Sequence, residues 1–236
     1  MLNESNAVHL QGIIVGQGRL SHETHGENFY EYKLKVNRRS GAVDILPVLI
    51  SERLIDRPLN EGDLVSINGQ MRSYNQIIGN VDGKLKTKLI LNIFAVDFIM
   101  PVAENLMNPN TIKLKGYLCK QPVLRETSLT KKEVCDVLIA VNRQYNKSDY
   151  IPCLAWGRNA KYLSRFKVGD EIKIEGRIQS REYVKKISET ESETRIAYEV
   201  SIANITKVTE AVHPEYPEDV VTIITDTPED EGGIDE

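Results

Sequence analysis

The sequence has 236 residues, of which 41% are hydrophobic and 27% are charged, so it can form one large domain or two of about 100 residues. No run approaches the roughly 18 apolar residues of a membrane span, and the first residues lack a signal peptide pattern, so we expect an intracellular protein. Three widely spaced cysteines argue against a disulfide framework or a zinc site, so we expect reduced, buried thiols at Cys119, Cys135 and Cys153.

The net charge of −4 is distributed unevenly along the chain. Residues 1–105 hold 11 basic and 12 acidic residues, whereas residues 106–208 hold 19 basic and 12 acidic ones. Residues 209–236 hold ten acidic residues and no Lys or Arg. The chain therefore has a nearly neutral part, a part with a charge of +7, and a polyanionic tail.

An internal repeat with an offset of 104 to 107 residues divides the chain before the tail. The matching segments, in order, are Asn6–Gly12 and Asn110–Gly116, Leu34–Arg38 and Ile139–Arg143, Asp44–Leu49 and Asp149–Leu154, Gly62–Ser73 and Gly169–Ser180, and Thr87–Ile93 and Thr194–Val200. Because five landmarks recur in the same order, we predict a tandem duplication of one domain, with copies at 1–105 and 106–208. The stretch Pro101–Asn110 is the predicted linker.

Each copy is dominated by a hydrophobic period of two, which indicates half-buried strands. The only predicted helix of the second copy is Asn159–Phe166, with Asn159 as its cap, and the first copy has Ser51–Arg57 at the same place. Three strands, a helix and two further strands predict an all-β fold of two tandem five-stranded Greek-key OB barrels. An SH3-like barrel or a small sandwich fits the alternation of strands but not the helix.

A protein that binds single strands without sequence specificity needs exposed rings and cations, and the second copy has both. Tyr150 and Trp156 differ by an even number of positions along one strand, so both rings can leave the face opposite to Cys153. The other outward candidates are Tyr145, Tyr183, Arg143, Arg177, Arg181, Lys113 and Lys115. Aromatic residues of a barrel are also common core residues, so burial is the alternative for each ring.

The second copy resembles the bacterial single-stranded DNA-binding proteins across about residues 110–208, and residues 6–100 do so more weakly. The segments that carry the resemblance are Tyr150–Arg158, Ala160–Leu163, Lys167–Asp170 and Ile174–Tyr183. It implies base stacking on Tyr145, Tyr150, Trp156 and Tyr183, binding of single-stranded DNA without sequence specificity, and a role in replication, recombination and repair. It also implies an assembly of four OB folds, which this chain reaches as a homodimer, in the bacterial cytoplasm at the nucleoid.

The first copy departs from this pattern at the stacking positions. The residues that match Tyr150, Trp156 and Tyr183 are Ile45, Ser51 and Gln76, with Tyr74 nearby as a substitute ring. We therefore expect the first copy to serve in dimerisation or as a scaffold and to bind DNA weakly.

The acidic tail ends without the terminal aromatic residue by which members of that family dock on replication and repair proteins. Ile234 alone could fill a partner's pocket, while the other interpretation is a polyanion that competes with DNA for the basic face.

The sequence contains no nucleotide-binding loop and no recognisable nucleophile motif, so we expect no cofactor and no enzymatic activity. The alternative function is a tandem OB-fold module, an accessory of a plasmid, phage or primosome, whose chief ligand is another protein.

Overall fold

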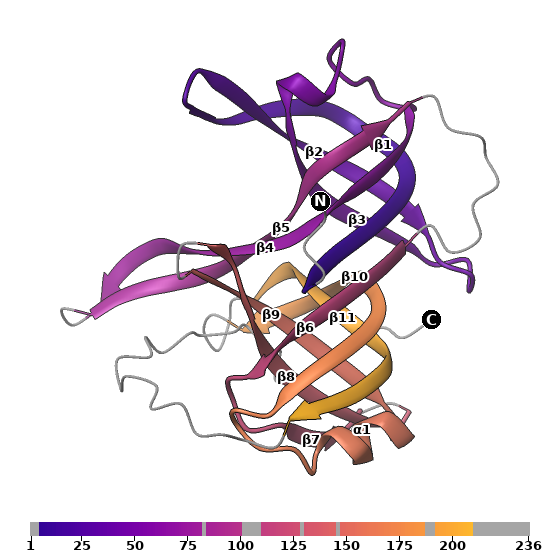
Figure 1. Ribbon diagram of the computed structural model, residues 1–236, viewed down its shortest axis with the longest axis vertical. Coiled ribbons are helices and arrows are strands. Elements are labelled where there is room, and N and C mark those ends of the chain that lie inside the picture. Colours follow the sequence, from indigo (N-terminus) through magenta and orange to yellow (C-terminus); the bar gives the residue numbers. More distant parts are fainter. Residues whose placement is uncertain are drawn as a thin grey trace.

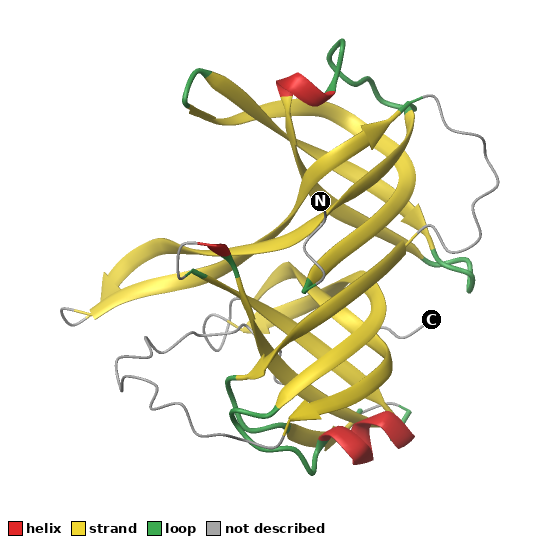
Figure 2. Ribbon diagram, viewed as in Figure 1, coloured by secondary structure: helices red, strands yellow, loops and turns green. Residues whose placement is uncertain are grey.

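The computed structural model describes residues 5–81, 84–100, 110–127, 130–144, 147–186 and 192–209. Most of these residues lie in β-strands, as Figure 2 shows. The predicted linker, except Asn110, and the predicted tail, except Thr209, lie outside the described residues. Within the described ranges, no helix is long and apolar enough to cross a membrane, and no cluster of three or more His, Cys, Asp or Glu could hold a metal ion.

The first barrel is a closed set of five strands in the order β2-β3-β5-β4-β1, because β2 also pairs with β1. These strands are β1 (Asn6–Thr24), β2 (Glu27–Asn37), β3 (Val43–Ser51), β4 (Leu64–Val81) and β5 (Lys84–Ile99). A short 3-10 helix, η1 (Glu52–Leu54), follows β3. The predicted helix at Ser51–Arg57 is therefore reduced to one turn, with Ser51 as its cap.

The second barrel repeats this plan in the order β6-β10-β11-β9-β8, and β6 closes it by pairing with β8. Its elements are β6 (Asn110–Leu118), β7 (Val123–Glu126), β8 (Glu133–Asn142), β9 (Ser148–Trp156), α1 (Arg158–Leu163), β10 (Glu171–Lys186) and β11 (Ser192–Thr209). Among the described residues, the short strand β7 pairs only with β8 and lies at the edge of the sheet. The sequence therefore predicted the all-β class, both five-stranded barrels and the position of the helix correctly.

The cap of α1 differs from the prediction. Gly157 is the N-terminal cap, with a φ of 53°, and no side chain donates or accepts at this cap. Asn159 lies inside the helix instead, and its amide donates a hydrogen bond of 2.8 Å to the carbonyl of Ala203. Ala203 is the extra residue of a bulge in β11, so Asn159 satisfies a carbonyl that the strand ladder leaves open.

The alternating apolar residues form one continuous core that extends through both barrels. Cys135 and Cys153 are buried and Cys119 is half-buried, and all three are free thiols, as expected. Burial raises the pKa of Cys119 and of Cys135 to about 11, so neither thiol is a ready nucleophile at neutral pH.

The two barrels are joined edge to edge by an antiparallel pairing of β1 with β6. In Figure 1 the first barrel lies above the second, with this joint between them. Val8 lies opposite Ile112, its own counterpart in the repeat, so the joint has an approximate two-fold axis there. The Asn residue that opens each copy binds the neighbouring strand of its own barrel: Asn6 exchanges two hydrogen bonds with the backbone of Met71 on β4, and Asn110 does the same with Ile178 on β10.

Each barrel sends a long hairpin, which we call an arm, onto the other barrel. The first arm is residues 72–92 of β4 and β5, and the second arm is residues 179–199 of β10 and β11. The first arm projects to the left of both barrels in Figure 1.

The second arm is fixed to the first barrel by the fully buried carboxylate of Asp44. The backbone N–H of Ser180 donates to this carboxylate at 2.7 Å, and the guanidinium of Arg38 donates to both of its oxygens at 2.8 and 2.7 Å. The backbone N–H of Ile45 in turn donates to the hydroxyl of Ser180 at 3.1 Å.

The same arrangement recurs on the other side of the joint around Asp149, which is also fully buried. It accepts hydrogen bonds from the backbone N–H of Ser73 at 2.7 Å and from the guanidinium groups of Arg72 and Arg143 at 3.1 and 3.2 Å. The backbone N–H of Tyr150 donates to the hydroxyl of Ser73 at 2.7 Å. We call the two clusters the Asp44 latch and the Asp149 latch.

We expect the Asp44 latch to carry a large part of the stability, because a buried charge pair is costly when one partner is removed. Asp44→Ala removes the carboxylate that pairs with Arg38 and accepts from the N–H of Ser180, and it should lower the free energy of unfolding by about 3–5 kcal/mol. Urea denaturation would measure the loss. Arg19→Ala, which breaks the exposed Arg19–Glu31 pair, is the control and should cost at most about 1 kcal/mol. Equal losses in the two variants would contradict this assignment.

Candidate nucleic-acid interface

The rings of Trp156 and Tyr150 lie on the outer face of β9, as the alternation of inward and outward residues along this strand predicted. Trp156 is 39% exposed and Tyr150 is half-buried, whereas Ile151, Cys153 and Ala155 between them point into the core. The expected orientation of both rings is therefore confirmed. The two residues are six positions apart along the extended strand, which is about 20 Å.

Local backbone geometry explains why Trp156 is presented at the end of a strand. Gly157 follows with a positive φ, and its N–H donates to the carbonyl of Glu133 at 2.8 Å, so the chain leaves β9 sharply and enters α1. On the neighbouring hairpin, the hydroxyl of Thr127 accepts a hydrogen bond of 3.0 Å from the N–H of Lys132. This bond fixes the turn that leads from β7 to β8.

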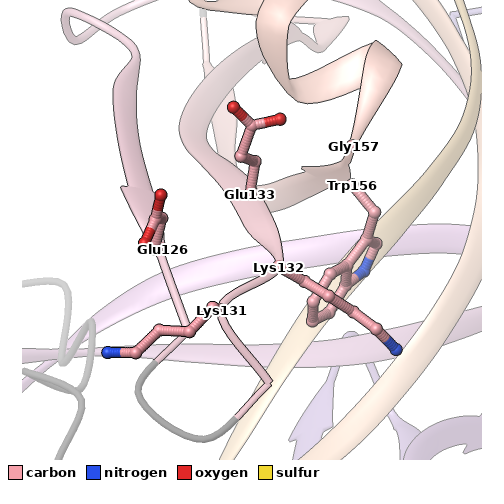
Figure 3. Close-up of a pocket in the computed structure, with 6 residues that line it drawn as sticks. All are labelled: Glu126, Lys131, Lys132, Glu133, Trp156 and Gly157. Carbon is pink, nitrogen blue, oxygen red and sulfur yellow. The ribbon is translucent and has the colours of Figure 1, made fainter.

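These two strand ends enclose an open hollow of about 490 Å³ that is lined by Glu126, Lys131, Lys132, Glu133, Trp156 and Gly157. In the view of Figure 3 the side chains of Lys132 and Trp156 both run downward and cross, while Glu133 points upward, away from them. Glu133 is engaged by Lys161 at 3.0 Å, so its charge is compensated. Neither Lys131 nor Lys132 forms an ion pair with any residue that the structure describes. The hollow thus combines an exposed indole with two available cations.

The sequence reasoning missed Lys131 and Lys132, although the dibasic pair directly before a strand was a visible signal. It named five other cations, and the structure places each of them beside a carboxylate. These pairs are Lys113–Glu175 at 3.1 Å, Lys115–Glu171 at 3.2 Å, Arg143–Asp149 at 3.2 Å, Arg181–Glu199 at 3.4 Å and Arg177–Asp44 at 3.8 Å. Contact of these five side chains with DNA stays a prediction. Each of them already has a carboxylate partner, which would compete with a DNA phosphate.

The structure does not gather these five cations around the rings. Lys113 and Lys115 lie on β6, which does not pair with β9, and Lys113 is opposite Ala7 in the joint between the barrels. Arg143 belongs to the Asp149 latch. Arg177 is half-buried beside Asp44, and burial and the nearby Arg38 lower its pKa.

The predicted exposure of Tyr183 is wrong, because this ring is only 7% exposed. It leaves the second barrel on the expected face and is not part of the hydrophobic core. However, it lies on the second arm, three residues after Ser180, which is hydrogen-bonded to Asp44 of the first barrel. The ring is therefore buried on an arm that is held against the other barrel at Ser180. The remaining ring, Tyr145, lies outside the described residues.

The first copy has no ring at the position of Trp156, as expected. Ser51 is buried there, and its hydroxyl donates to the carboxylate of Glu27. A different aromatic cluster covers this part of the first barrel: Phe29, opposite Ser51 on β2, stacks on His22 at 4.9 Å and lies 5.9 Å from Phe94. Sequence reasoning missed this cluster because its members are far apart along the chain.

Comparisons with known proteins agree with this architecture. Residues 109–206 match the single-strand binding protein family. "Single-stranded DNA-binding protein 1" of Clostridium acetobutylicum is 35% identical over 81 residues, which cover 31% of this chain and 74% of the relative. "Single-stranded DNA-binding protein" of Clostridium tetani is 37% identical over 86 residues, which cover 33% of this chain and 57% of the relative.

The likeness in structure extends over both barrels. The crystal structure of the wild-type single-stranded DNA binding protein from Thermus aquaticus superposes with a TM-score of 0.65 at 19% identity. That superposition covers 89% of this chain and 95% of the other. On the sequence match to the Clostridium acetobutylicum relative, the chain belongs to the single-strand binding protein family.

Proposed function

We propose that the protein binds single-stranded DNA without sequence specificity, mainly through the outer face of β9 in the second barrel. The observation that carries the proposal is the exposed indole of Trp156 in a hollow that also contains Lys131 and Lys132. Stacking accepts every base because each has a π-face, and the lysines attract phosphates without reading the sequence. The names of the Clostridium relatives support the same activity.

In this mechanism one base stacks on Trp156 and another on Tyr150. The rings are held by the barrel before DNA arrives, so little ordering of the protein opposes binding. By coating exposed strands the protein would support replication, recombination and repair in the bacterial cytoplasm. We also propose that repair enzymes dock on the acidic tail. The first copy, whose stacking positions lack the rings of the second, should bind DNA weakly.

Trp156→Ala should weaken binding of oligo-dT by about 1–3 kcal/mol, the usual value of one base stacked on a ring. Trp156→Phe keeps a ring and should lose less. Because Trp156 is the only tryptophan, quenching of its fluorescence in the wild-type chain reports on this site alone. Tyr162→Ala, which removes an exposed ring from α1, is the control and should bind like wild type. Full affinity of Trp156→Ala would favour the protein-interaction module instead.

The salt dependence of binding distinguishes the two lysines of the hollow from the two lysines of β6 that were named from the sequence. Each phosphate contact contributes about 0.7 to the slope of log affinity against log salt for single strands. The double variant Lys131→Gln/Lys132→Gln should therefore reduce the slope by about 1.4. The double variant Lys113→Gln/Lys115→Gln removes cations that already have carboxylate partners, and it should leave the slope almost unchanged. The reverse result would favour the lysines named from the sequence over those of the hollow.

We also propose that two chains associate into a homodimer with four OB folds, as the family resemblance implies. Sedimentation equilibrium should then give twice the 26.7 kDa mass of one chain. A mass of one chain across the concentration range would contradict the assembly but not the DNA-binding face, because that face is complete within one chain.

A further inference from the structure

The second barrel has an open strand edge at β7 (Val123–Glu126). Within the described part of the chain, this strand pairs with β8 on one side and with no strand on the other. In an antiparallel strand, alternate backbone N–H and C=O groups point away from the partner. The open edge of β7 therefore offers backbone hydrogen bonds to a further strand.

Two neighbouring apolar side chains are exposed on this strand, Val123 by 57% and Leu124 by 45%. Because side chains alternate along a strand, they point to opposite faces of it. Charged residues commonly protect such edges, and the first copy has one: Arg19 matches Val123 in the repeat and forms an ion pair with Glu31 across its hairpin. At this position β7 has valine instead, which indicates that another segment covers the edge.

The last described strand ends close to the place where β7 begins. The ammonium group of Lys207, near the end of β11, lies 5.4 Å from the centroid of the Phe166 ring. The side-chain amide of Gln121, two positions before β7, donates to the carbonyl of Phe166 at 3.3 Å. Figure 1 shows β7, α1 and the arrowhead of β11 at the same end of the second barrel. Residues 210–236, which lie outside the described residues, therefore start near β7.

One part of residues 210–236 has the composition of a strand. It is the run 220–225, Val-Val-Thr-Ile-Ile-Thr, in which every residue is β-branched. Such residues favour strands, and Pro217 and Pro228 bound the run on either side. The ten residues between Thr209 and Val220 can span up to about 35 Å when extended, so the run can reach β7 within one chain.

The charges of the two segments are complementary. Acidic residues flank the run on both sides, Glu218 and Asp219 before it and Asp226 after it. The turn that follows β7 contains Lys131 and Lys132, and neither forms an ion pair with any described residue. Either direction of the run beside β7 therefore brings carboxylates toward these lysines.

We propose that residues 220–225 add to the open edge of β7 as a further strand of the same chain. The backbone of the run pairs with β7, its apolar side chains cover Val123 and Leu124, and its flanking carboxylates lie near Lys131 and Lys132. This binding site goes beyond the proposed function and does not depend on DNA. Residues 226–236 then leave the molecule from the edge of the second barrel rather than from the end of β11.

Hydrogen exchange of the full chain, measured without DNA, tests this pairing. In residues 123–126, the N–H groups that point away from β8 should exchange faster by about tenfold or more in the double variant Val221→Pro/Ile223→Pro, because proline removes donors from the added strand. Gly232→Pro/Ile234→Pro places two prolines outside the run and is the matched control, which should exchange like wild type. Equal exchange in the wild type and the first variant would overturn the proposal.

The same contact can be tested from the side of the barrel. Val123→Ser/Leu124→Ser removes the apolar contacts of the edge and should speed the exchange of residues 220–225 by about tenfold. Leu20→Ser changes the 56% exposed residue that matches Leu124 in the first copy, and it should leave the exchange of the run unchanged. The proline variants alter no residue of either barrel, so the exchange of β6 and β10 should match wild type in both.

Dilution distinguishes pairing within one chain from pairing between chains. The slow exchange of residues 123–126 should be independent of protein concentration. Slow exchange that disappears on dilution would overturn the proposal in favour of a strand supplied by a second copy. Slow exchange in a chain that does not bind oligo-dT would contradict the proposed function and leave this inference intact, because no step of it involves DNA.

Discussion

Two buried carboxylates, Asp44 and Asp149, determine how the barrels and arms are placed. A charge without solvent is tolerated only when it is paired and hydrogen-bonded, so each carboxylate requires its arginines and the N–H of a serine on the opposite arm. The β1–β6 ladder sets the register of the joint, and the latches fix the arms across it. Consequently, the first arm is held against β9 of the second barrel and the second arm against β3 of the first.

Sequence reasoning succeeded where the signal is local. Alternation along single strands gave both barrels and the outward direction of Tyr150 and Trp156, because period and parity are properties of one strand. The repeat even located the latch residues: Asp44 and Asp149, and Ser73 and Ser180, were landmarks of the duplication. Their function as a cross-barrel contact was not predictable, because it depends on which segment of one copy approaches the other.

The errors have the same physical origin. The alternation of residues along β10 placed Tyr183 outside the core of its own barrel, but it could not indicate that the ring is buried on an arm that is held against the other barrel. Similarly, a lysine or arginine on the wet face of a strand is a candidate phosphate contact until its neighbour across the ladder is known. Arg143 and Lys113 form ion pairs with carboxylates, whereas Lys132 forms none with any described residue. Ion pairing across the sheet therefore decided which cations are available, and no single-strand pattern contains that information.

The joining of both barrels in one chain also changes how the two halves can diverge. In an assembly of identical subunits, every substitution occurs on both sides of the two-fold axis at once. Here Ser51 and Trp156 occupy matching positions within one molecule, so each side has been free to change without the other. Because the two barrels belong to one chain, dilution does not lower the local concentration at which they contact each other. The two sides of the molecule thus present different surfaces, with a buried Ser51 on one side and an exposed Trp156 on the other.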